Sequence, residues 1–297
     1  MKRTKGILFA LISAGTFGLI PLFSISLIQS GMGLSSIIFY RFLFSTIMMG
    51  GACLLQKKRF RIEFKVLQKV LYVSILYAIT ALGLIFSYLY IPSGVATTIH
   101  FLYPVLVTFI MTVFYKEKKS VALFLAAAFS LAGVGFLTWS GGATLNPIGV
   151  LLILSIVVTY AVYIVGINKW SMDHMDSHVL TFYILLCATL LLGIYIVSTS
   201  ELAPIGALSN WINLLLLAFL PTVISNLTLI LAIKNVGSTV TSILGSVEPL
   251  VAVLVGVLWF KEDFGFYSVI GLTLVTTSVV LVVLTGKRAK QKDPAIG

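Results

Sequence analysis

Charged residues are scarce in this sequence, and their scarcity excludes most classes of soluble protein. Only 10% of the 297 residues are charged, while 59% are hydrophobic; soluble domains carry about 25% charged residues. Acidic residues are the rarest, with 9 against 20 lysines and arginines. A water-soluble fold could not keep so much apolar surface away from water, so the composition predicts an integral membrane protein.

Cysteine and histidine are also rare. Cys53 and Cys187 both lie within apolar stretches, which provides neither a disulfide framework nor the spacing of metal ligands. One polar stretch holds two histidines and two aspartates: Asp173, His174, Asp176 and His178. Helical spacing could place these four around a metal, but a solvated loop is the simpler interpretation. The ATP-binding pattern Gly-x-x-x-x-Gly-Lys-Ser/Thr is absent, so we expect no cofactor, no metal and no ATP-driven step.

Apolar stretches follow one another along the chain with only short interruptions. A helix needs about 20 mostly apolar residues to cross a bilayer. The stretches that meet this requirement are 6–29, 35–55, 67–89, 93–115, 120–140, 147–168, 178–199, 210–232, 236–260 and 263–285. The shortest breaks are at Tyr90–Pro92 and at Lys234–Asn235, where Tyr-Ile-Pro-Ser-Gly and Lys-Asn-Val-Gly-Ser supply residues that can end a helix. The sequence therefore predicts an all-α membrane protein with ten transmembrane helices.

Basic residues are distributed unevenly between the two sides of such a protein. With ten spans both termini lie on one side, and that side collects all but two of the 20 basic residues. The exceptions are Arg41, inside the second span, and Lys261, in an opposite loop. Because cytoplasmic loops retain lysine and arginine, we expect both termini in the cytoplasm. The net charge of +11 then reflects insertion and contact with anionic lipid headgroups, not a nucleic-acid partner.

The two halves of the chain repeat one another. Lys116-Glu117 aligns with Lys261-Glu262 at an offset of 145 residues, and Phe39-Tyr40 aligns with Phe182-Tyr183 at an offset of 143. Each predicted unit holds five spans, and because five is odd the second unit is inserted upside down. The predicted units are 1–142 and 143–286, followed by a basic cytoplasmic tail over 287–297. Inverted repeats of this kind are typical of secondary transporters, with the substrate site near the midplane between the repeats.

Short fragments along the whole chain carry a family resemblance. They are the start Gly6-Ile-Leu-Phe-Ala-Leu-Ile-Ser-Ala with Phe17-Gly18, then Tyr40-Arg41-Phe42, Leu102-Tyr103-Pro104 with Glu117, and Glu248-Pro249 with Glu262. In their order and duplication the chain resembles the drug/metabolite transporter superfamily, specifically the ten-helix EamA-type transporters. The resemblance implies two inverted five-helix units around a central cavity, and transport of small organic solutes driven by an ion gradient or by exchange.

Two ionisable residues fall inside predicted spans. Glu248 lies near the middle of the ninth span, where a carboxyl group must be paired, protonated or facing water. We interpret it as a proton-coupling site or a counter-charge for an ammonium substrate, and a structural carboxyl group between helices is the alternative. Arg41 could snorkel to the surface, bind a substrate carboxylate, or pair with Glu248 in one transport state.

Polar stripes precede two of the membrane prolines. Thr97, His100 and Tyr103 recur at three-residue intervals before Pro104, so they share one helix face. Their repeat mates do the same before Pro249: Ser242, Gly245 and Glu248. The two stripes could face each other across the cavity, with the prolines loosening the helices for gating. Ordinary hydrogen bonding between helices beside a kink is the alternative.

A third polar face follows Pro221 in the eighth span. It consists of Thr222, Ser225 and Asn226, mirrored more weakly in the third span by Tyr77 and Thr80. Serine and threonine often satisfy backbone carbonyls around a membrane proline, which favours a structural role. Aromatic residues of the fifth and sixth spans are interpreted as cavity walls or interface anchors: Trp139, Tyr160 and Tyr163.

These observations favour a secondary transporter, and specifically an exporter working by alternating access. One central acid, one basic residue and many aromatics suit a small zwitterion or an organic cation such as an amino acid or amine. The alternatives are an intramembrane enzyme, a non-transporting scaffold and a channel. The expected location is a bacterial inner membrane, and the expected partners are a small-molecule substrate, protons and lipid. Both a monomer and a homodimer are compatible with the sequence.

Overall fold

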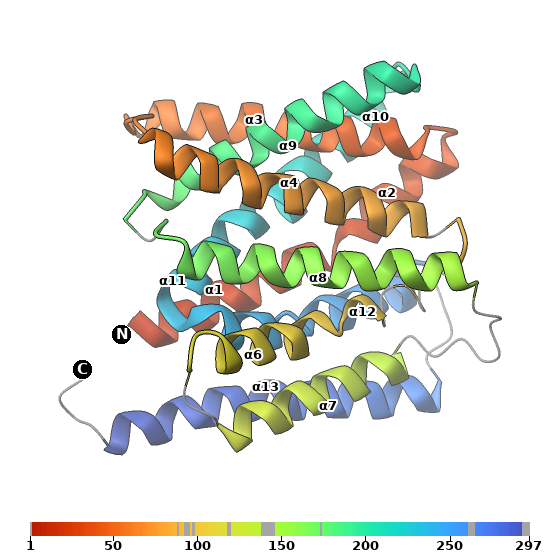
Figure 1. The fold of residues 1–297 in the computed structure, drawn as a ribbon. Helices are drawn as coiled ribbons and strands as arrows, with labels where there is room; N and C mark the ends of the chain where they lie inside the picture. Colours follow the sequence, from red (N-terminus) through yellow and green to blue (C-terminus); the bar gives the residue numbers. More distant parts are fainter. Residues whose placement is uncertain are drawn as a thin grey trace.

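The computed structural model describes residues 2–87, 89–91, 96, 99–117, 120–137, 146–172, 174–260 and 265–292. Over these ranges the chain forms helices and no strands. Figure 1 shows the helices side by side in one bundle, with the start of α1 and the end of α13 at the same end. The all-α architecture predicted from the sequence is confirmed.

The helices divide evenly between the two halves of the chain. The first half contains α1 (Lys2–Phe17), α2 (Ile20–Gln29), α3 (Leu34–Leu55), α4 (Phe64–Ser87), α6 (Tyr103–Val113) and α7 (Val121–Leu137). The second half contains α8 (Pro147–Lys169), α9 (Ser177–Thr199), α10 (Leu208–Ala218), the π-helix η1 (Phe219–Ile224), α11 (Ser225–Leu244), α12 (Val247–Phe260) and α13 (Phe266–Lys292). Among the described residues, six helical segments are long and apolar enough to cross a membrane, and four shorter apolar helices accompany them.

Several predicted spans are interrupted, which corrects the expectation of continuous helices. The span over 6–29 breaks between α1 and α2, and the span over 236–260 breaks between α11 and α12. Proline lies in the first turn of α2 and of α6. It is tolerated there because the N–H group of a first-turn residue has no partner within the helix. The turn expected near Lys234 lies at Gly237, whose φ of 81° leaves the helical region and suits glycine. As a result α11 contains the end of one span and the start of the next.

Helix α3 of the first half packs along α9 of the second, and their contacts are symmetric. The Tyr40 hydroxyl donates to the carbonyl of Ala203 at 3.1 Å, and the Tyr183 hydroxyl donates to the carbonyl of Phe60 at 2.8 Å. Tyr40 and Tyr183 are repeat mates at the offset of 143, and so are Phe60 and Ala203. Each tyrosine therefore holds the segment that follows the other's helix, one at each end of the bundle. This is the arrangement that inverted repeats produce.

Candidate functional site

The break between α11 and α12 places Glu248 inside the bundle. Glu248 lies in the first turn of α12, where the positive end of the helix favours a carboxylate. The break between α1 and α2 packs against the same place: a Cβ added to Gly18 would lie 2.5 Å from the carbonyl oxygen of Glu248. Two interrupted helices, one from each half of the chain, thus meet at the backbone of Glu248. The acidic residue predicted for the midplane is half-buried at the contact between the repeats.

The two predicted polar stripes approach one another beside Glu248. A Cβ added to Gly245 would collide with the hydroxyl of Tyr103, so α6 and the α11–α12 break are in contact. A cavity of about 10 Å³ lies here, lined among others by Tyr103, Ser242, Gly245 and Glu248. This volume has room for about one water molecule. The third member of the first stripe, Thr97, lies outside the described residues.

A row of tyrosines extends from this cavity toward α4. The rings of Tyr103 and Tyr160 meet edge-on with centroids 4.7 Å apart, Tyr160 stacks on Tyr163 at 5.8 Å, and Tyr163 stacks on Tyr77 at 5.0 Å. His100 packs on the first two, with centroids 5.4 Å from Tyr103 and 5.3 Å from Tyr160. The row joins α6, α8 and α4, which gives the site an aromatic wall that sequence reasoning treated only as general lining.

Arg41 faces the π-helix η1 in this conformation and does not snorkel. Its Nε donates to Thr222 Oγ1 at 2.6 Å, and its Nη2 lies 3.4 Å from the carbonyl oxygen of Pro221. The Thr222 hydroxyl in turn donates to the carbonyl of Leu217 at 3.0 Å. The charges of Arg41 and Glu248 attract each other, although neither forms a salt bridge with any residue that the structure describes. The basic and acidic groups predicted for the midplane thus share one electrostatic environment.

The polar face after Pro221 has mixed roles. Ser225 and Ser13 each donate a hydroxyl to the other's carbonyl at 2.9 Å, a contact that joins α11 to α1 and supports the structural interpretation of Ser225. Asn226 donates to the Tyr77 hydroxyl at 2.9 Å and to the carbonyl of Thr222 at 2.8 Å. Five buried side-chain atoms have no hydrogen-bond partner in the described part of the chain, and three of them belong to this region: Asn226 Oδ1, Tyr163 Oη and His100 Nδ1. Buried polar atoms normally have hydrogen-bond partners, so we expect water or a ligand to supply the missing hydrogen bonds.

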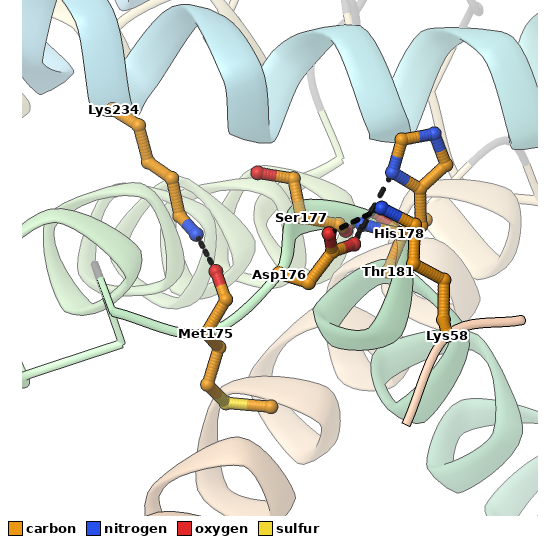
Figure 2. Close-up of polar contacts among 7 residues, drawn as sticks. All are labelled: Lys58, Met175, Asp176, Ser177, His178, Thr181 and Lys234. Carbon is orange, nitrogen blue, oxygen red and sulfur yellow. Dashed lines mark hydrogen bonds and ion pairs between the residues drawn. The ribbon is translucent and has the colours of Figure 1, made fainter. Parts of the chain in front are cut away.

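A second polar cluster lies at the end of the bundle that carries the N-terminus (Figure 2). Lys58 Nζ lies 2.7 Å from Asp176 Oδ2, and Lys234 Nζ donates to the carbonyl of Met175 at 2.5 Å. Asp176 also caps α9 by accepting from the backbone N–H of His178 at 2.8 Å. Burial alone would raise the pKa of Asp176, but the hydrogen bonds and charges of Lys58 and His178 outweigh it and lower that pKa.

This cluster is the one for which sequence spacing left a metal open. In the described residues, no group of three or more histidine, cysteine, aspartate or glutamate side chains is arranged to hold a metal ion. Asp176 instead forms an ion pair with Lys58 and caps the N-terminus of α9. Asp173, the other aspartate of the stretch, lies outside the described residues.

Comparisons with known proteins cover nearly the whole chain, and one of them matches its two halves separately. The fold is similar to that of a protein of unstated function whose crystal structure is known. The superposition has a TM-score of 0.84 and covers 97% of this chain and 99% of that chain, at 17% sequence identity. At this identity the likeness concerns the fold. No match was found among curated proteins. The model of the EamA-like transporter family matches residues 4–139 and again residues 147–284. The chain is therefore a member of the EamA-like transporter family, a multi-pass membrane transporter of the drug/metabolite transporter superfamily.

Proposed function

We propose that the protein is a secondary active transporter that exports small organic metabolites, amino acids or amines, in exchange for protons. The observation that carries the proposal is the position of Glu248, where broken helices of both repeats meet beside a small cavity. A carboxyl group in the membrane interior is costly and is usually functional. Here it has an aromatic wall on one side and the charge of Arg41 nearby.

The substrate class follows from the groups around the cavity. Tyrosine faces attract organic cations, and a carboxylate attracts them more strongly, so an ammonium group suits the space between Tyr103, Tyr160 and Glu248. The guanidinium of Arg41 can bind a carboxylate with two parallel hydrogen bonds. A small zwitterion would use both charges, and the unpartnered atoms of His100, Tyr163 and Asn226 would supply further hydrogen bonds.

Coupling to protons requires that the substrate and a proton compete for one group. A carboxylate that holds an ammonium group is deprotonated, and a protonated carboxyl group no longer attracts the cation. Glu248 would therefore release substrate when it takes a proton from outside and bind substrate again after losing that proton inside. The exchange then exports one cationic group at the expense of the proton gradient.

The cavity must open to each side in turn for transport. At about 10 Å³ it is far smaller than the roughly 300–1,000 Å³ of ordinary ligand sites, so the cavity must also widen before it can hold a substrate. Helix breaks at Gly18, Gly237 and Gly245, together with the π-helix at Pro221, supply positions where helix segments can tilt. Rocking of the two five-helix halves about the α3–α9 contact would expose Glu248 to one side at a time.

The proposed location is a bacterial inner membrane with both termini in the cytoplasm. Supporting this orientation, the basic segment over 57–69 connects α3 and α4 at the end of the bundle where α1 begins (Figure 1).

The test is transport by purified protein in liposomes with a panel of amino acids, amines and sugars. We expect a substrate-dependent proton flux and trans-stimulation, both lost in Glu248→Gln and both kept in the control Glu63→Gln, which changes an exposed carboxylate. Substrate flux that persists unchanged in Glu248→Gln would remove that residue from the mechanism. A channel would conduct without trans-stimulation, and a scaffold or an intramembrane enzyme would give no flux with any substrate.

A further inference from the structure

A pocket of about 380 Å³ opens at the end of the bundle opposite the N-terminus, away from the central cavity. Its walls come from the first turns of α3 and from the last turns of α4 and the residues after it. The apolar part of its lining includes Leu34, Ile38, Leu82, Phe86 and Leu89, and Glu201 contributes the one carboxylate. The volume falls within the range of about 300–1,000 Å³ that is usual for small-molecule sites.

The symmetry of the repeats identifies the counterpart of this pocket at the other end of the bundle. At the offset of 143, Glu201 is the mate of Lys58, and Gly33 is the mate of Asp176. Lys58 and Asp176 form an ion pair at 2.7 Å, shown in Figure 2. At the pocket the basic residue is replaced by an acid, and its partner is replaced by a residue without a side chain. The pocket thus carries a single charge, opposite in sign to that of Lys58, and has space where a partner side chain would stand.

Glu201 has no basic partner among the residues that the structure describes. Its side chain is exposed and makes no hydrogen bond or ion pair with any described residue, although its backbone carbonyl accepts from the Ser36 hydroxyl at 2.8 Å. Helix α3 begins at Leu34 without a side-chain cap, so its positive end also lies near the pocket. That partial charge amounts to about half an elementary charge, which is less than the full charge of the carboxylate. The net field in the pocket therefore favours a cation.

We propose that this pocket is a second ligand site, separate from the central one, for an organic cation with an apolar body. The ammonium group would pair with Glu201 in the place that Lys58 and Asp176 occupy together at the opposite end. The apolar body would lie against Ile38, Leu82 and Phe86. A ligand of this class would reach the site from the side opposite the termini.

The experiment measures binding of benzyltrimethylammonium, whose charge does not depend on pH, to the purified full chain in lipid nanodiscs by isothermal titration calorimetry. Glu201→Gln should weaken binding about fivefold, the scale of a partly exposed ion pair. Gly33→Lys should abolish binding at this site, because the new ammonium group would neutralise Glu201 from within the chain. Gly33→Gln is the matched control: it adds similar bulk without charge and should bind more tightly than Gly33→Lys.

Gly33 tolerates these changes because its φ of −63° and ψ of 142° are open to any residue, and nothing lies within 4 Å of an added Cβ. The affinity measured in Glu248→Gln separates the two sites: the Glu201-dependent binding should persist there, whatever happens to transport. Equal binding by wild type, Glu201→Gln and Gly33→Lys would overturn the proposal. Binding seen in detergent but not in nanodiscs would overturn it too, because a lipid chain would then be the occupant. Equal binding of the anion phenylacetate would also contradict it.

Discussion

Thr46 and Thr189 share a hydrogen bond of 2.8 Å between their hydroxyls, although 143 residues separate them in the chain. That separation equals the offset of the internal repeat, so each threonine is the other's repeat mate. A residue that contacts its own mate lies beside the twofold axis relating the two halves. The α3–α9 contact therefore marks the axis about which the repeats are inverted, and both side chains are buried there.

Replacing both of these threonines should cost less than the two single replacements added together. In Thr46→Val the Thr189 hydroxyl keeps its bond to the carbonyl of Leu185 but loses its partner across the axis, and we expect a loss of about 1 kcal/mol of stability. In the double variant both hydroxyls are absent and two methyl groups meet, so the loss should be smaller than the sum of the single losses. A double-mutant cycle of unfolding in detergent measures the coupling. Strict additivity would show that the bond contributes nothing.

The symmetric tyrosine bonds should control opposite ends of the molecule. Tyr183→Phe removes the bond to Phe60 at the end that carries the N-terminus, and Tyr40→Phe removes the bond to Ala203 at the other end. A net hydrogen bond contributes about 1 kcal/mol, so each variant should shift the balance between open and closed forms about fivefold in favour of opening its own end. Labelling of single cysteines placed at each end, in a Cys53→Ser, Cys187→Ser background, measures this. Equal changes at both ends in either variant would contradict the symmetric arrangement.

Much of the fold could be predicted because insertion into a membrane constrains which residues can stand in the spans and in the loops. Each pass requires an apolar stretch, and each loop on one side carries lysine or arginine. The sequence indicated a loosened helix at Pro249, whereas the break beside Pro21 was not predicted although a proline in the first turn of a helix was its visible signal. A hydropathy pattern reports how apolar a segment is, and a break inside an apolar segment does not change it.

The sequence named both the charges of the candidate site and several of its aromatic residues, but it did not show how the aromatic rings stack. Glu248 and Arg41 stand out because ionisable groups are rare inside a span. Tyr77, Tyr160 and Tyr163 do not, because tyrosine is common in membrane helices and their stacking joins helices that are distant in the chain. The spacing of Tyr160 and Tyr163 places both on one helix face, but only the packing of α8 against α4 determines what that face meets.

Gly245→Ala should impair the central site because of Tyr103. The added methyl group would collide with the tyrosine hydroxyl, so we expect a loss of transport of tenfold or more, on the order of the 1.4 kcal/mol that such a factor represents. Adding Tyr103→Phe removes the closer of two colliding atoms and leaves the carbonyl oxygen of Ser242 at 2.9 Å from the added Cβ. It should therefore restore part of the loss, since the remaining ring atom lies 3.5 Å from that Cβ. Transport rates of both single variants and the double variant check this. No recovery in the double variant would show that the helix itself, not the contact, needs glycine.

Arg41→Lys should change substrate preference more than it changes folding. The ammonium group of lysine keeps the charge beside Thr222 but loses the planar pair of donors that suits a carboxylate. Transport of amino acids should therefore fall about tenfold relative to transport of amines without a carboxylate, within the range of a charge-assisted bond. Competition between an amino acid and its decarboxylated amine in the same vesicles measures the ratio. An equal loss for both substrates would place Arg41 in the scaffold instead of the binding site.

The ion pair between Lys58 and Asp176 should make stability depend on pH in one direction. The pKa of Asp176 is lowered in the folded protein, so the folded state favours the charged carboxylate. The stabilisation is then present above the ordinary aspartate pKa and is lost as the pH falls through the lower folded value. We therefore measure unfolding temperatures in detergent from pH 6 down to about pH 3, a range that includes the ordinary aspartate pKa of about 3.9. The unfolding temperature should decline more steeply for wild type than for Asp176→Asn. Asparagine keeps the helix cap, so the difference isolates the charge. Parallel declines in the two proteins would mean that the pair contributes no measurable stability.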